Sequence, residues 1–127
     1  VANAVVGEVT TRVIGRDQDA VIDPVACDTA RRWLARVVAL WQEGRCRPVA
    51  LPPRTALAHA KSPTTTAAQT TYEGNRQMHG EVEKSPYVAR LYPDYAALLA
   101  DSDFAALAEA IYRPLLDAAR VADEASP

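Results

Sequence analysis

Alanine is the residue that most constrains how this chain can fold. It accounts for 25 of the 127 residues, and so for a large share of the 49% hydrophobic content. Because alanine is the best helix former and is depleted in strands, we expect a helix-rich chain with a modest supply of large apolar side chains. A length of 127 residues fits one domain, or part of one, with enough core to fold without disulfides or metals.

The N-terminal segment is the exception to this helical character. Residues 4–14 are rich in β-branched side chains and partly alternate, residues 15–19 supply turn-forming side chains, and Val21 and Ile22 follow. This pattern predicts a strand, a turn and a shorter strand within residues 1–23.

A helix is predicted to follow, from Pro24 to Gly44. Asp23 suits the N-cap, proline suits the first helical position, and Gly44 suits the left-handed residue that ends a helix. Apolar residues recur every three to four positions along one face, at Ala30, Trp33, Leu34, Val37, Val38 and Trp41. The other face carries the charged residues Asp28, Arg31, Arg32 and Arg36.

Prolines and capping residues delimit the other predicted helices. An extended linker is expected at Pro48, Pro52 and Pro53, because proline lacks an N–H donor and disfavours helix in the preceding residue. The remaining helices are predicted over about residues 54–61, 62–72, 85–92 and 102–120. The residues expected to cap, end or kink them are Ser62 with Pro63, Gly74, Asn75, Ser85 with Pro86, Pro93, Asp94 or Asp101, and Pro114.

The expected fold class is therefore α+β and mostly helical. An N-terminal strand pair in residues 1–23 precedes about four to five helices in residues 24–120, and residues 121–127 form a frayed tail. We expect these parts to make up a single fragment, residues 1–127, of something longer. The chain lacks an initiator methionine, which also indicates a fragment.

Charge is distributed unevenly, although the net charge is only −2. Residues 30–61 carry seven basic side chains and one acidic side chain, whereas residues 94–127 carry two basic and seven acidic ones. A near-neutral total excludes a strongly basic nucleic-acid binder but leaves room for a local basic surface. The candidate DNA-binding residues are Arg31, Arg32, Arg36, Arg45, Arg47 and Arg54, with Lys61 beside them. The alternative is a solvated helix face and a polar loop.

The sequence predicts no metal site and no cofactor. The soft metal ligands Cys27, Cys46, His59 and His79 are separated by 18, 12 and 19 residues, whereas a zinc module needs closely paired ligands. No apolar run approaches the roughly 18 residues of a membrane span, and no charged signal-peptide segment opens the chain. We therefore expect a soluble protein with no membrane partner.

Several stretches of the chain, in order, resemble one family. The first is RPVALPPRTALA at 47–58; the others are YEGN at 72–75, GE at 80–81 and SPYVARLYPD at 85–94. Together, over about residues 30–119, they resemble the C-terminal end of RecC, the gamma subunit of exodeoxyribonuclease V. The residues before the first helix match this family only in general character.

The resemblance implies a non-catalytic subunit of the bacterial, cytoplasmic RecBCD helicase–nuclease, which processes double-strand DNA ends in recombinational repair. It also implies that residues 1–127 are a fragment of the C-terminal domain of that larger subunit, a restriction-endonuclease-like domain without a working active site. The partners it implies are the beta and alpha subunits of the same enzyme and a duplex DNA end. Its role would be to handle DNA and to hold the other subunits.

The residues themselves support the absence of catalysis. A nuclease of that fold needs an acidic residue two positions before a lysine, so that carboxylates hold Mg²⁺ beside the lysine. His59 stands two positions before Lys61 and Val82 two positions before Lys84, so no catalytic residue is predicted. Two alternatives stay open: a truncated Mg²⁺-dependent nuclease with catalytic residues upstream, and a helical interaction module unrelated to recombination.

Eight residues in the stretches that resemble RecC are candidates for a partner interface. They are Tyr72, Glu73, Gly74, Asn75, Gly80, Glu81, Tyr87 and Arg90. For the first four, the competing interpretation is a helix C-cap with an inward tyrosine. Glu81 and Glu83 could also act as paired carboxylates in acid–base or metal chemistry, but a hydrophilic loop is the preferred interpretation. The tyrosines at positions 87, 92, 95 and 112, with Arg90, could stack on exposed bases, but their helical spacing favours an apolar helix face.

Overall fold

The computed structural model describes residues 1–16, 19–62 and 64–121, and its chain divides into two compact units. Unit 1 comprises residues 1–47 and the chain from Pro114 onward, and unit 2 comprises Pro48–Arg113. The class is α+β and mostly helical, as the sequence predicts. These elements do not establish a restriction-endonuclease-like fold, which stays a prediction. None of the helices in the described ranges is long and apolar enough to cross a membrane.

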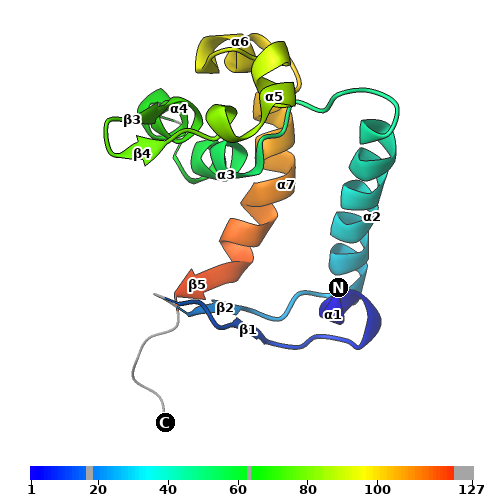
Figure 1. Ribbon diagram of the computed structural model, residues 1–127. Helices are drawn as coiled ribbons and strands as arrows, with labels where there is room; N and C mark the ends of the chain where they lie inside the picture. The colour runs from blue at the N-terminus through cyan, green and yellow to red at the C-terminus, as the bar shows by residue number, and fades with distance from the viewer. Residues whose placement is uncertain (17–18, 63, 122–127) are drawn as a thin grey trace. The chain divides into compact units, whose positions relative to one another are not determined.

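A three-stranded antiparallel sheet lies in unit 1. Its strands are β1 (Thr11–Val13), β2 (Ala20–Ile22) and β5 (Ala119–Val121), in the order β1-β2-β5. β1 and β2 form the predicted N-terminal pair, with Arg12 opposite Val21. Figure 1 shows that β5, at the far end of the chain, completes the sheet beside β2.

Two features of this sheet correct the sequence prediction. The strand predicted over residues 4–14 is confined to β1, and its beginning is replaced by a short helix, α1 (Ala2–Val5). The residues of β5 were predicted as the end of the last helix and the start of a frayed tail. They pair with β2 instead, since that strand has a free edge. The rest of the predicted tail, residues 122–127, and two residues of the predicted turn, 17–18, lie outside the described ranges.

The long amphipathic helix is present as α2 (Cys27–Gly44), with ends that differ from those expected. Its first residue, Cys27, lies three positions after Pro24, and its N-cap residue is Ala26, which makes no side-chain capping hydrogen bond. Asp23 instead accepts a hydrogen bond from the Arg120 guanidinium at 2.9 Å, and its N–H donates to the Ala118 carbonyl at 2.9 Å. Gly44 is the last helical residue and has no positive φ, so it is not the left-handed terminator predicted.

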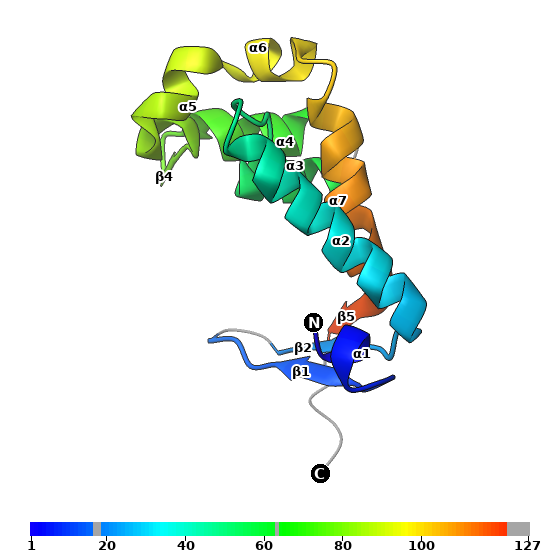
Figure 2. The ribbon, with the colours of Figure 1, turned by 90° about the vertical axis from the view of Figure 1, so that its right-hand side faces the viewer.

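The apolar stripe of α2 is largely exposed within the described chain. Ala30 is buried beside α1, whereas Val37 and Val38 are about half exposed and Trp41 is 62% exposed. The helical spacing correctly predicts the helix but not the burial of the stripe's second half. Figure 2 shows α2 along its length, with α1 at its N-terminal end.

Unit 2 contains the remaining helices and a small hairpin. Its elements are α3 (Pro53–Lys61), α4 (Thr65–Glu73), β3 (Gly74–Asn75), β4 (Met78–His79), η1 (Val82–Lys84), α5 (Pro86–Leu91), α6 (Tyr95–Ala100) and the first ten residues of α7 (Phe104–Ala118). The predicted caps hold for Ser85 and Asp94, whose side chains accept from the N–H groups of Val88 and Ala97. Pro63, the proline of the predicted cap before α4, lies outside the described residues. α7 continues through Pro114, and the kink predicted there stays a prediction.

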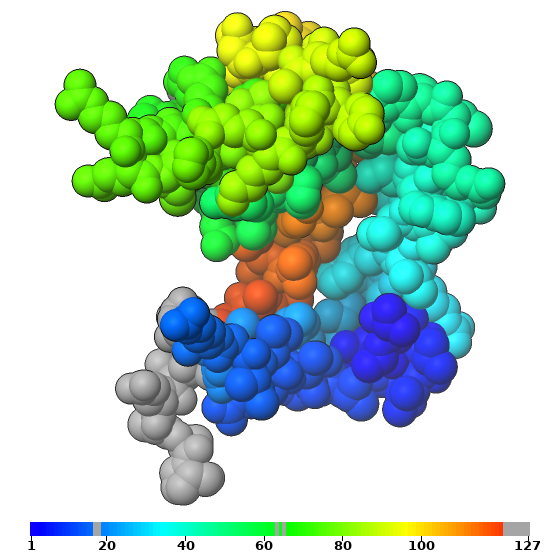
Figure 3. Space-filling view, viewed as in Figure 1, coloured from blue at the N-terminus to red at the C-terminus, as the bar shows by residue number. Residues whose placement is uncertain are grey.

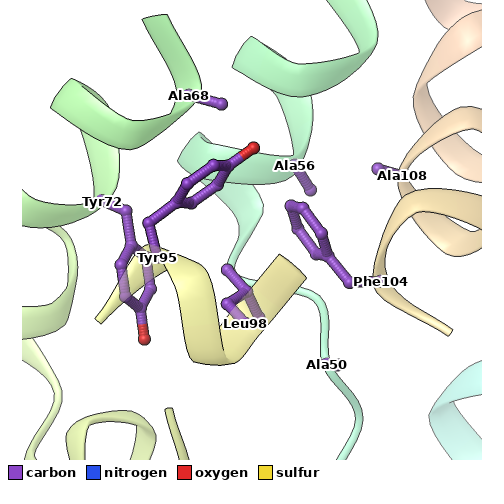
Figure 4. Packing of buried hydrophobic residues seen from close by; sticks show 8 residues of the cluster. All are labelled: Ala50, Ala56, Ala68, Tyr72, Tyr95, Leu98, Phe104 and Ala108. Carbon is purple, nitrogen blue, oxygen red and sulfur yellow. The ribbon is translucent and has the colours of Figure 1, made fainter. Parts of the chain in front are cut away.

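The core of unit 2 is built from a few aromatic rings among alanines. Tyr72, Leu98 and Phe104 are fully buried, and Tyr95 is nearly so. The Tyr95 and Phe104 rings meet edge to face with their centroids 6.2 Å apart, a favourable aromatic geometry. Figure 4 shows these rings between α3, α4, α6 and α7, where alanines allow the helices to approach closely.

Candidate nucleic-acid and partner interface

The basic side of α2 presents two exposed arginines one helical turn apart. Arg32 donates to the Thr29 hydroxyl at 3.0 Å, a bond that leaves most of its guanidinium open to solvent. Arg36 is exposed and makes no hydrogen bond or ion pair with another residue of the described ranges. Their spacing of four places both on one face, so the two positive charges reinforce each other. This face can contact phosphate groups.

Arg31 has a structural contact that its neighbours lack. Its Nε donates to the Ala4 carbonyl at 3.1 Å, which ties α2 to α1. The Cys27 thiol makes a parallel link, since it donates to the Asn3 carbonyl at 3.0 Å. Asp28 lies 4.0 Å from the Arg31 guanidinium, so this arginine also has a charged neighbour. Arg31 is therefore less available for a ligand than Arg32 or Arg36.

The next two candidate arginines lie just beyond α2. The Arg45 guanidinium stands over the Trp41 ring, 5.4 Å from its centroid, in cation–π geometry. Arg47 forms an ion pair with Glu43 one turn earlier. Both side chains remain more than a third exposed. They extend the basic character of the α2 segment toward its C-terminal end.

The structure does not bring all the DNA-binding candidates onto one unit. Five of the six arginines belong to unit 1, whereas Arg54 lies in α3 of unit 2, as does Lys61. Both α3 side chains are exposed. A shared surface can thus be argued only for the arginines carried by α2 and the residues immediately after it.

The partner-interface candidates in residues 72–75 and 80–81 have clear structural contacts. Tyr72 is fully buried, and its hydroxyl donates to the Tyr92 carbonyl at 2.6 Å. Burial, followed by the charge of nearby Glu81, raises the pKa of Tyr72 to about 12. The structure therefore agrees with the alternative interpretation of residues 72–75, in which the tyrosine at the end of the helix packs inward.

Glu73 connects two helices of unit 2. One oxygen of its carboxylate accepts from the backbone N–H of Tyr95 at 2.9 Å, at the first residue of α6. The other accepts from the Gln69 amide at 3.0 Å, one turn earlier in α4. A carboxylate near the N-terminus of a helix is favoured by the unpaired N–H groups and by the helix dipole. Glu73 therefore helps to hold α6 against α4.

Glu81 performs the same task for α3. Its carboxylate accepts from the backbone N–H of Arg54 at 3.0 Å, from the N–H of Thr55 at 2.8 Å and from the Thr55 hydroxyl at 2.7 Å. The N-cap residue of α3 is Pro52, which has no side-chain acceptor, so the missing cap comes from a residue 26 positions away.

The two glycines between these glutamates pack against one another. Gly74 ends α4 with a φ of +80°, and a Cβ there would lie 2.5 Å from the Gly80 nitrogen. A Cβ on Gly80 would lie 2.3 Å from the Tyr72 carbonyl oxygen. The Asn75 carboxamide then accepts from the N–H groups of Gln77 and Met78, both at 2.9 Å. This turn forms the β3–β4 hairpin, which stands out from the surface of unit 2 in Figure 3.

Glu81 and Glu83, considered as paired carboxylates, each bind a different partner in the structure. Glu81 caps α3, whereas Glu83 lies 2.6 Å from His79 Nδ1 on the exposed hairpin. The hydrogen bond from His79 lowers the pKa of Glu83. Within the described ranges, no three histidine, cysteine or acidic side chains form a group that could hold a metal ion.

Tyr87 and Arg90 are the exposed members of the partner-interface set on α5. Tyr87 is 80% exposed and forms part of an apolar groove of about 340 Å³ between α5 and the proline-rich segment 48–53. The groove is lined by Pro48, Val49, Leu51, Pro52, Pro53, Tyr87, Val88, Leu91 and Tyr92. Sequence reasoning singled out Tyr87 but missed the groove, because its two walls are more than thirty positions apart.

Residues 1–63 match the family described as the RecC C-terminal domain. No curated protein and no solved structure matches the chain.

The match includes only one of the motifs that suggested the same family, the proline-rich stretch at 47–58. It includes the N-terminal strands, α2, the proline-rich stretch and α3. Residues 1–23, which were judged to resemble RecC only in general character, are within it. The YEGN block and the segments after it lie beyond residue 63, so their resemblance to RecC stays a prediction.

Proposed function

Because this chain belongs to the RecC C-terminal domain family, we propose that it is a non-catalytic DNA-handling and scaffold module of the helicase–nuclease. RecC implies the RecBCD complex of recombination and repair, exodeoxyribonuclease V. Within it, the module would contact the beta and alpha subunits and a duplex DNA end. A restriction-endonuclease-like domain without a working active site is the corresponding fold proposal.

The observation that carries the DNA-handling role is the pair of exposed arginines on α2. Arg32 and Arg36 lie one turn apart, on the side of the helix away from its apolar stripe. Guanidinium groups bind phosphate oxygens through paired hydrogen bonds and keep their charge at any physiological pH. Such contacts position a duplex without reading its sequence, which is what a DNA-handling module requires.

The proposal that the module is non-catalytic is supported by what its carboxylates do. Glu73 and Glu81 accept hydrogen bonds at the N-termini of two helices, so their oxygens already have partners. A metal-dependent nuclease needs carboxylates free to bind Mg²⁺ beside a lysine. The only acidic residue next to Lys84 in the chain is Glu83, which is hydrogen-bonded to His79.

A binding titration tests the DNA-handling role. The purified chain is titrated onto a fluorescent linear duplex at low salt, and the dissociation constant is read from anisotropy. We expect the Arg32→Glu/Arg36→Glu double variant to bind at least about tenfold more weakly, since two phosphate contacts become repulsions. Arg76→Glu, an exposed arginine on the β3–β4 turn, is the matched control for charge reversal. Equal losses in both variants would contradict a specific role for α2.

A nuclease assay tests the non-catalytic role. The chain is incubated with Mg²⁺ and linear duplex DNA, and degradation is followed on a gel. We expect no degradation above that of a mock purification. Metal-dependent degradation that co-purifies with the chain and disappears in Glu83→Gln would overturn the proposal. Glu83 is preferred to Glu81 for this test, because removing the α3 cap would also disturb the fold.

A further inference from the structure

The groove beside α5 has one wall that is held in place by hydrogen bonds. The Tyr92 carbonyl accepts from the buried Tyr72 hydroxyl at 2.6 Å, and the Tyr92 hydroxyl donates to the Asp101 carboxylate at 2.8 Å. The opposite wall contains three prolines, whose rings fix the backbone. A groove with both walls fixed loses little conformational entropy when it is filled.

All nine side chains that line the groove are apolar or aromatic, and none of them is charged. Arg54 follows the last proline of one wall, and Arg90 lies one turn from Tyr87 on the other. Both side chains are exposed, and neither makes a hydrogen bond or ion pair with another residue in the described part of the chain.

The acidic residues nearest in sequence are engaged elsewhere. Glu81 caps α3, Glu83 is bonded to His79, and Asp94 caps α6. Asp101 is bonded to the Tyr92 hydroxyl. Among the charged residues beside the groove walls in sequence, Arg54 and Arg90 therefore have side chains without a hydrogen bond or ion pair in the described part of the chain.

We propose that this groove binds a segment of another subunit, one that inserts apolar side chains and carries acidic residues at its ends. The inference rests on the scaffold role proposed above and names the surface that would perform it. An apolar floor suits aliphatic or aromatic side chains, and Arg54 and Arg90 suit carboxylates on either side. A nucleic acid is disfavoured, because a strand needs cations along the groove that follows its phosphates.

The experiment measures binding of the immobilised chain to the purified alpha subunit and, separately, to the purified beta subunit. The first variant is Tyr87→Ala, which removes a ring that is 80% exposed and so leaves the core intact. The second is Leu91→Ala on the same wall, and the third is Arg90→Glu at the margin. Leu99→Ala on α6 is the control, an exposed leucine outside the groove. Thermal melts verify that each variant is folded.

We expect Tyr87→Ala and Leu91→Ala to weaken binding of one subunit by about tenfold or more, with Leu99→Ala unchanged. Arg90→Glu should weaken the same complex most at low salt, where charge pairing is least screened. Unchanged binding in all three groove variants, beside a wild-type chain that binds, would overturn this inference alone. A wild-type chain that binds neither subunit would contradict the scaffold role and the inference with it. Loss of single-stranded DNA binding in Tyr87→Ala, with subunit binding unchanged, would assign the groove to nucleic acid and overturn it.

Discussion

The Glu81 carboxylate accepts hydrogen bonds from both the backbone N–H and the hydroxyl of Thr55, at 2.8 and 2.7 Å. Thr55 is fully buried, so both of its donors depend on this one side chain. The contact joins the start of α3 to the chain just after the hairpin, and with Glu73 at the start of α6 it forms a pair of long-range caps. The YEGN and GE motifs therefore have a structural function in unit 2.

We predict that Glu81→Ala destabilises the protein by about 2–4 kcal/mol. The variant removes the cap of α3 and leaves the buried donors of Thr55 without a partner, and each effect costs roughly 1–2 kcal/mol. Urea unfolding followed by circular dichroism measures the loss. Glu83→Ala, two residues away on an exposed pair, is the control and should unfold at nearly the same urea concentration. Equal midpoints for both variants would show that the cap contributes nothing.

We predict that Gly80→Ala is more damaging than Gly7→Ala. A Cβ on Gly80 would stand 2.3 Å from a backbone oxygen, whereas a Cβ on Gly7 would meet nothing within 4 Å. Gly7 has a φ of +123°, so its substitution still costs conformational strain but no clash. Thermal melts should therefore show a larger fall in Tm for Gly80→Ala. The reverse order would contradict the close packing of the hairpin against α4.

We predict that the protein loses stability as the pH rises from about 10 to about 12. Burial raises the pKa of Tyr72 from 10 to about 12, and burial also raises the pKa of Tyr95 and Tyr112. Between these two pKa values the unfolded chain loses the tyrosine proton while the folded protein still holds it. The free energy of unfolding is therefore greatest below pH 10 and falls as the pH rises toward 12. Urea midpoints across this pH range measure the effect.

Tyr72→Phe is the variant that isolates this tyrosine. It removes the ionisable group, so the alkaline loss should become smaller, and at neutral pH the variant should lose about 1 kcal/mol with its hydrogen bond to the Tyr92 carbonyl. An unchanged alkaline profile in Tyr72→Phe would assign the loss to other groups.

The sequence predicts the local elements well, because local patterns determine them. The three-to-four spacing of Trp33, Val37 and Trp41 predicts α2, and Ser85 with Pro86 predicts the start of α5. The same spacing does not say what covers the stripe, since a helix carries the pattern whether or not a partner is present. The structure leaves the second half of that stripe exposed within unit 1.

Contacts between distant residues are what sequence reasoning missed. β5 has the sequence Ala119, Arg120, Val121, which has no strand pattern of its own and pairs with β2 about a hundred positions earlier. The cap of α3 comes from Glu81, although one clue was available: two prolines precede Arg54 and offer no side-chain acceptor. Of the candidate site residues, Arg32, Arg36 and Tyr87 are exposed in the structure, whereas Tyr72 belongs to the core. The apolar face preferred for the tyrosines does not hold for Tyr87.

The measurement that tests the central claim most directly is the salt dependence of duplex binding. In a plot of the logarithm of the binding constant against the logarithm of the salt concentration, each phosphate that the protein neutralises makes the downward slope steeper by about 0.9. If Arg32 and Arg36 contact DNA, the Arg32→Glu/Arg36→Glu variant should have a slope shallower by about 2 than wild type. The Arg76→Glu control should keep the wild-type slope. A slope unchanged in the double variant would contradict a DNA-handling role for α2.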